Sequence, residues 1–168
     1  MKLGWFGRQE KPQQSRMALG LRRANDLLRQ RNYAGAITAY QQILNEDPEN
    51  LGVLLNLGTA LHLSGQHSRA IERFEQVLAR DPNHVVALIN LSAAHGALGH
   101  LDKGIEALVQ ALQVDSTRRD LHYNLAALYV RKGQAANAMA ELELELAIHP
   151  DHKLAQRTRV ELRKQLLK

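Results

Sequence analysis

The sequence predicts an all-α fold in which helical hairpins stack into an array. Three observations support this class: a 34-residue period, glycines and prolines at fixed places within it, and a composition poor in aromatic residues. Hydrophobic residues make up 45% of the 168 residues, but aromatic residues only 4%. A core of this composition depends on alanine and leucine, which favour packed helices over a β-sandwich.

The period divides residues 17–152 into four blocks, 17–50, 51–84, 85–118 and 119–152. Small residues fill the eighth place of each block: Ala24, Gly58, Ser92 and Ala126. They also fill the twentieth place: Ala36, Ala70, Gly104 and Ala138. Bulky residues fill the twenty-fourth: Tyr40, Phe74, Leu108 and Leu142. We expect each block to be a pair of antiparallel helices that approach closely at the small residues, with the bulky residues packed around them.

Glycine and proline mark the expected helix ends. Gly65, Gly99 and Gly133 stand where the first helix of a block must end, since glycine readily takes the left-handed cap conformation. Proline follows the second helix in three blocks, at Pro48, Pro82 and Pro150. The stretch ELELELAIHP (141–150) alternates as a strand does, but its register within the period predicts a second helix.

This pattern resembles the tetratricopeptide repeat (TPR) family, which asks for a small residue at place eight, Ala at twenty, an aromatic at twenty-four and Pro at thirty-two. The resemblance covers residues 17–152 and implies a right-handed α-solenoid of helix-turn-helix repeats. Some residues depart from the pattern. In the third block Ser116 replaces proline and Gly104 replaces alanine, and in the fourth Glu145 replaces a small residue. In the first block Gly20 and Arg23 replace apolar residues, as expected of an end repeat.

The two ends of the chain are basic and the middle is not. Residues 1–16 carry four basic and one acidic residue, and residues 153–168 carry six and one, so the middle of this +5 chain sums to −3. A nucleic-acid partner is therefore not expected, because its binding track would be continuously basic. We expect residues 1–16 to be a basic segment that can be disordered. Residues 153–168, with Leu154, Leu162 and Leu166 at helical spacing, are expected to cap the array.

No residue pattern predicts catalysis, a cofactor or a metal. The chain has no cysteine, no glycine-rich phosphate loop and no nucleophile elbow. HPDH (149–152) places two histidines three apart in a turn, but no third ligand is expected to converge there. We therefore expect a non-enzyme. The absence of a signal peptide or membrane-length apolar run predicts a cytoplasmic protein.

Three asparagines, 34 residues apart, are the candidate binding residues. Asn56, Asn90 and Asn124 stand on first helices, about 150° from the face that meets the hairpin partner. The resemblance implies that first helices line a concave groove, where asparagine amides would pair with the backbone of an extended peptide. Similar asparagine ladders occur in the TPR arrays of O-linked N-acetylglucosamine transferases. Alternatively, these asparagines are solvated or bonded to the neighbouring repeat.

Five further residues complete the expected peptide-binding set. Asn25, Thr59 and Arg131 share the same face, and Arg22 and Arg29 make its first-block end basic. The clamp that TPR proteins use for acidic chaperone C-termini is not expected, because Leu21, Val86 and Asn90 occupy its basic places.

The preferred functional hypothesis is an adaptor that binds a protein or peptide partner in its groove and aids complex assembly. The alternative is a self-assembling scaffold, a homo-oligomer in which Trp5 and Phe6 of one copy dock into the groove of the next. A weaker reading has residues 1–8 touch a membrane surface.

Overall fold

The structure, a computed structural model, describes residues 12–166, and side chains from Arg16 onward. In that range the chain forms helices and no strand. The helices are α1 (Pro12–Arg29), α2 (Tyr33–Glu46), α3 (Leu51–Leu63), α4 (His67–Arg80), α5 (Val85–Ala97), α6 (Leu101–Val114), α7 (Leu121–Arg131), α8 (Ala135–Ile148) and α9 (Lys153–Leu166). The predicted all-α fold is confirmed, and the alternating stretch lies in α8 as its register indicated.

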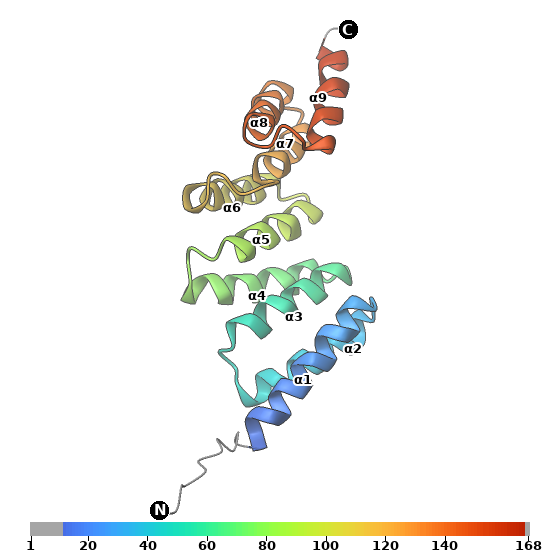
Figure 1. The fold of residues 1–168 in the computed structure, drawn as a ribbon, viewed down its shortest axis with the longest axis vertical. Helices are drawn as coiled ribbons and strands as arrows, with labels where there is room; N and C mark the ends of the chain where they lie inside the picture. The colour runs from blue at the N-terminus through green and yellow to red at the C-terminus, as the bar shows by residue number, and fades with distance from the viewer. Residues whose placement is uncertain (1–11, 167–168) are drawn as a thin grey trace, which may run out of the picture.

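The hairpins α1–α2, α3–α4, α5–α6 and α7–α8 correspond to the four blocks. Figure 1 shows them one above another along the long axis, from α1 and α2 at one end to α9 at the other. Each helix packs against its successor, and first helices also meet, α1 with α3 and α3 with α5. Residues 12–16, assigned from sequence to the N-terminal segment, belong to α1, because proline is well suited to the first position of a helix.

The small residues of the period sit where bulky residues need room. Phe74 of α4 is fully buried against Gly58 of α3. A Cβ added to Gly58 would lie 2.5 Å from Phe74 Cε1, which is closer than two carbons can approach. The bulky residues at the twenty-fourth place are all buried: Tyr40, Phe74, Leu108 and Leu142.

The expected glycine caps take the left-handed conformation. Gly65, Gly99 and Gly133 have φ of +82°, +79° and +76°. The first block has no glycine at this place, and Arg31 adopts φ 59° there. A side chain at positive φ is strained, so the turn geometry prevails over the preference of arginine.

A side-chain cap begins three helices, each of which follows the end of a block. One side chain, in the last place of the preceding block, accepts a hydrogen bond from a backbone N–H in the first turn. The acceptors are Asn50 Oδ1 for Val53, His84 Nδ1 for Ala87 and His152 Nδ1 for Ala155. Because each capping residue directly precedes its helix, α3, α5 and α9 begin at the next residue.

Helix α7 lacks this cap and begins later than its block. Arg118 stands at the capping place, but a guanidinium has no acceptor. The helix starts at Leu121, after Asp120 turns through φ 71°, and the acceptor comes from another helix. Glu145 of α8 accepts from the N–H of Asp120 at 3.2 Å and from that of Tyr123 at 3.4 Å. This explains a fully buried glutamate where the family pattern has a small residue.

Helix α9 packs on α8 through a narrower apolar stripe than expected. Ala155 and Leu162 are buried, one heptad apart, whereas Leu154 and Leu166 are each 54% exposed. Two of the three leucines predicted to cover the last hairpin therefore lie outside the contact, because Leu154 is turned about 100° from Ala155.

Candidate functional site

Two asparagines of the first helices are hydrogen-bonded to the preceding repeat. We call the surface that carries Asn25, Asn56, Thr59, Asn90 and Asn124 the ladder face. Asn56 Nδ2 donates to Asn25 Oδ1 at 3.3 Å, and Asn90 Nδ2 donates to Thr59 Oγ1 at 3.2 Å. Both pairs are 31 residues apart. Asn56 and Asn90 thus reach back to the first helix of the preceding hairpin, which was one of the two alternatives to a peptide contact.

Asn25 is fixed in place by a buried residue of the second helix of its own hairpin. The fully buried Tyr40 donates its hydroxyl to Asn25 Oδ1 at 2.6 Å. Burial raises the pKa of Tyr40, against a smaller lowering by Arg29, so the phenol keeps the proton that it donates. Asn25 Oδ1 therefore accepts from Tyr40 and Asn56 together, and the first rung is a structural junction.

Asn124 differs from the other asparagines. Ala93 stands 34 residues after Thr59, at the place where Asn124 would find its acceptor. A methyl group accepts no hydrogen bond. Within residues 16–166 the structure shows no hydrogen bond to the half-buried side chain of Asn124. Of the three predicted rungs, this one keeps its full capacity for a ligand.

The arginines of the predicted set are separated. Arg29 pairs with Asp26 at 2.6 Å, in an exposed contact on one helix. Arg131 Nη2 donates to the carbonyl of Gly96 at 2.7 Å, where α5 ends, so this side chain also ties two repeats together. Arg22 is exposed on α1. The first helices between them also expose apolar side chains, Leu63 at 50% and Val86 at 36%.

A separate cluster joins α9 to the fourth repeat. His152 Nε2 lies 2.6 Å from Asp120 Oδ1 and 3.8 Å from Glu145 Oε1, and the rings of His152 and Tyr123 are 4.9 Å apart. Of the HPDH stretch only His152 takes part, and the fold brings Asp120 and Glu145 to it, so that three potential ligand groups lie within 4.8 Å of one another.

The donor chemistry of this cluster fits a hydrogen-bond network. His152 Nδ1 accepts from Ala155 N–H, so the ring proton is on Nε2 and is donated to Asp120. A metal ion on Nε2 would move that proton to Nδ1, where it would face the Ala155 N–H. The departure from the family pattern at Glu145 was the sequence signal of this unusual junction.

Four other histidines lie at the turns of two hairpins. His62 and His67 approach with Nδ1 atoms 3.2 Å apart, and His95 and His100 with ring centroids 5.8 Å apart. His95 is 7% exposed, and its Nδ1 is the buried side-chain atom without a partner among the described residues. Burial, then His67, lowers the pKa of His62. Burial is also the main cause that lowers the pKa of His95.

Comparisons with known proteins agree with this architecture. One tetratricopeptide repeat model matches residues 27–84 and 61–109, and a second matches residues 89–153. No curated protein matches the chain in sequence.

Solved structures share the fold. The crystal structure of MamA is 25% identical, with a TM-score of 0.77 over 84% of this chain and 83% of that one. TTC0263, a thermophilic TPR protein of Thermus thermophilus, is 24% identical, with a TM-score of 0.74 over 89% and 82%. YrrB, described as a TPR protein with an unusual peptide-binding site, is 23% identical, with a TM-score of 0.74 over 81% and 70%.

Proposed function

The chain belongs to the tetratricopeptide repeat family, and we propose that it is an adaptor that binds an extended segment of a partner protein across its ladder face. TPR proteins generally mediate protein–protein interactions. YrrB, which shares the fold, is described as having a peptide-binding site. Likewise, TPR proteins are typically non-catalytic scaffolds, and we propose the same of this chain.

The observation that carries this proposal is the remaining hydrogen-bond capacity of the ladder. An asparagine amide has two N–H groups and an acceptor oxygen. Asn56 and Asn90 each donate one side-chain N–H to the preceding repeat, and this hydrogen bond fixes the orientation of the side chain. The side chain of Asn124 donates no hydrogen bond to any of the described residues. The amides of Asn56 and Asn90 are held in place before a ligand binds, which suits them to the alternating C=O and N–H groups of an extended backbone, because less side-chain ordering is needed on binding.

Apolar neighbours complete the proposed site. Leu63 and Val86 expose carbon beside the ladder, and Ala93 and Ala97 are short enough to admit a ligand side chain. Arg22, exposed at the α1 end, gives that end a positive charge. We propose that the partner segment presents apolar residues to the middle repeats and an acidic residue to α1.

Selection of displayed peptides on the full chain, followed by calorimetry, tests this function. Asn124→Ala should weaken a selected peptide about five- to tenfold, the loss of roughly 1 kcal/mol, while leaving the melting temperature unchanged or higher. Asn137→Ala, an exposed asparagine of α8, is the matched control. Equal affinities of the two variants, or no selected peptide at all, would contradict the ladder face as the site.

The alternative scaffold depends on Trp5 and Phe6, which lie outside the described residues, as does the segment 1–8 of the membrane reading. Among the described residues, no helix is both long and apolar enough to cross a bilayer. Light scattering of the full chain separates the two functions, since a head-to-tail scaffold grows with concentration and an adaptor does not.

A further inference from the structure

Two histidines face each other across the turn of the second hairpin. His62 lies in the last turn of α3, and His67 is the first residue of α4. Their Nδ1 atoms are 3.2 Å apart and their ring centroids 4.9 Å apart, with the ring planes inclined at 53°. Both residues are half-buried, so solvent reaches the pair. The two are five residues apart in the sequence, and the reversal of the chain between the helices brings the rings together.

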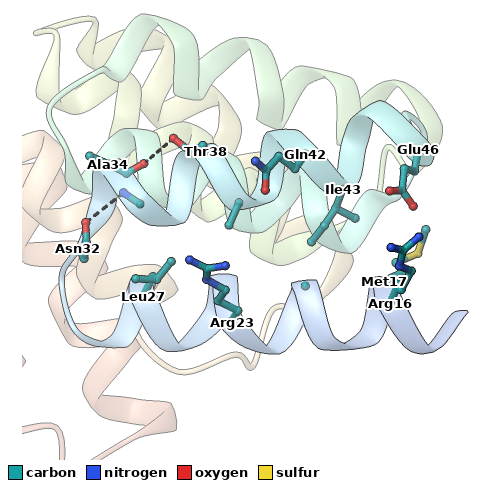
Figure 2. Close-up of a pocket in the computed structure, with 13 residues that line it drawn as sticks. Arg16, Met17, Arg23, Leu27, Asn32, Ala34, Thr38, Gln42, Ile43 and Glu46 are labelled. Carbon is teal, nitrogen blue, oxygen red and sulfur yellow. Dashed lines mark hydrogen bonds between the residues drawn. The ribbon is translucent and has the colours of Figure 1, made fainter. Parts of the chain in front are cut away.

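The turn between α3 and α4 is closed without help from either imidazole ring. Gly65, at φ +82°, reverses the chain, and the side chain of Gln66 donates to Ser64 Oγ at 3.0 Å. In the first hairpin the residue at the place of Gln66 is Asn32. Its Oδ1 accepts from the N–H of Gly35 at 3.0 Å and so caps α2, as Figure 2 shows. The second hairpin uses side chains of the loop for its turn and leaves the two rings to each other.

The repeat itself does not require histidine at these two places. The twelfth and seventeenth places of the other blocks hold Leu28 and Tyr33, Gly96 and Leu101, and Val130 and Ala135. The third hairpin has a histidine pair five residues apart, His95 and His100, but each stands one place earlier in its block. There the ring centroids are 5.8 Å apart and His95 is only 7% exposed. Among the described hairpins, close contact of two accessible imidazoles therefore belongs to the second one.

The spacing of the two Nδ1 atoms also suits a shared metal ion. An ion about 2.0–2.1 Å from each of two imidazole nitrogens keeps them about 3.3 Å apart in tetrahedral geometry. In the structure one Nδ1–H donates to the other Nδ1, and a metal bound by both atoms moves that proton to Nε2 of the same ring. Within residues 16–166 neither Nε2 has a hydrogen-bond partner, so solvent can accept from it. His152 lacks this freedom, since its Nδ1 faces the N–H of Ala155.

We propose that His62 and His67 bind a divalent transition-metal ion through their two Nδ1 atoms, with water completing the coordination. Imidazole is a ligand that suits Zn²⁺, Ni²⁺ and Cu²⁺. Burial, then His67, lowers the pKa of His62, which keeps that ring neutral and able to bind a metal near neutral pH. With two protein ligands the site exchanges its ion, unlike the closed four-ligand sites of structural zinc. The ion joins the end of α3 to the start of α4. The inference does not rest on the proposed function.

Calorimetric titration of the full chain, free of a histidine tag, with ZnCl₂ or CuCl₂ tests the site. We expect one site tighter than any other, with higher affinity for Cu²⁺ than for Zn²⁺. His67→Gln removes one ligand and should weaken this site by about tenfold or more, since even the loss of a residue that only supports a ligand has that effect. His100→Gln, in the third hairpin, is the matched control and should leave the affinity unchanged. Zn²⁺ should raise the melting temperature of the unaltered protein and of the control, but not that of His67→Gln.

The tautomers of the two rings give a second measurement, made on the unaltered protein. In ¹⁵N spectra of the metal-free chain we expect one ring of the pair to carry its proton on Nδ1 and the other on Nε2. With Zn²⁺ both rings should carry it on Nε2. This result stands even if His67→Gln fails to fold, which circular dichroism checks.

Three results would overturn the proposal. The first is an unaltered protein that binds neither ion saturably. The second is binding that a folded His67→Gln retains at full affinity, which would place the ion on other residues. The third is a pair of rings whose tautomers Zn²⁺ leaves unchanged, which would mean that the two histidines form a hydrogen bond only.

Discussion

Asn90 and Thr59, 31 residues apart, are joined by a 3.2 Å hydrogen bond from Asn90 Nδ2 to Thr59 Oγ1. The hydroxyl of Thr59 donates a hydrogen bond to the carbonyl of Leu55 at 3.0 Å, so a lone pair of its oxygen is free to accept from Asn90. Asn56 makes the equivalent bond to Asn25. The periodic asparagine therefore stabilises the junction of successive repeats, in addition to any role in binding.

The junction predicts opposite effects of one substitution at two rungs. Asn90→Ala loses a bond worth about 1 kcal/mol, offset by about 0.5 kcal/mol of better helix propensity, so it should destabilise the fold slightly. Asn124→Ala loses no such bond within the described residues and should be neutral or stabilising. Urea unfolding of both variants measures the difference, which we expect to be about 1 kcal/mol. A double-mutant cycle of Asn90→Ala with Thr59→Val should show the same coupling, and additive effects would contradict the bridge.

Glu145 should be the most sensitive carboxylate of the fold. Glu145→Ala leaves the N–H groups of Asp120 and Tyr123 without their acceptor and opens a cavity, so we expect a loss of roughly 3 kcal/mol in the free energy of unfolding. Glu145→Gln keeps one acceptor oxygen and should lose less. Glu143→Gln, an exposed site on the same helix, should change stability by less than about 0.5 kcal/mol. A tolerant Glu145 would refute its role as the cap of α7.

The buried ring of His95 predicts a loss of stability in acid. Burial lowers its pKa below 6.5, Lys103 and His100 add to this, and Glu75 and Glu106 oppose it. The unfolded chain therefore binds the proton more tightly than the folded one. The stabilisation is complete above the unfolded pKa and is lost as the pH falls through and below 6.5.

The measurement is unfolding by urea from about pH 7.5 to about pH 5. His95→Leu, with the residue that Leu61 provides at the same place of the second block, should weaken the pH dependence. Some dependence should remain, because burial also lowers the pKa of His62. If His95→Leu unfolds with the same dependence on pH as the unaltered protein, His95 is not a source of the loss of stability in acid.

Substitution of two leucines of α9 should distinguish the face of this helix that packs on the array from the face exposed to solvent. Leu162→Ala removes a side chain that is 5% exposed and should destabilise the protein by about 2–3 kcal/mol. Leu154→Ala removes one that is 54% exposed and should cost less than about 0.5 kcal/mol. Melting curves of the two variants measure the two losses of stability. Similar losses would mean that α9 packs through a different face.

The sequence by itself determined the hairpins and their ends. Small and bulky residues at a 34-residue spacing specify where two helices approach, as Gly58 and Phe74 do, and this contact lies within one block. Gly65, Gly99 and Gly133 specify turns through their own backbone preference. Such signals are local and recur from block to block, so the pattern is still recognised where one block departs from it, as at Ser116.

Only the tertiary structure decided which partner each polar side chain meets on a neighbouring helix and which apolar side chains are buried there. A helical wheel places Asn90 on the face away from its partner helix, but the Thr59 acceptor depends on how the preceding hairpin is set against it. The same holds for Glu145, which caps a helix more than twenty residues away, and for Ala155, which takes the contact expected of Leu154. The physical reason is that periodicity fixes direction around one helix, whereas hydrogen bonds and burial depend on the angle and offset between helices, which the packing of whole hairpins sets.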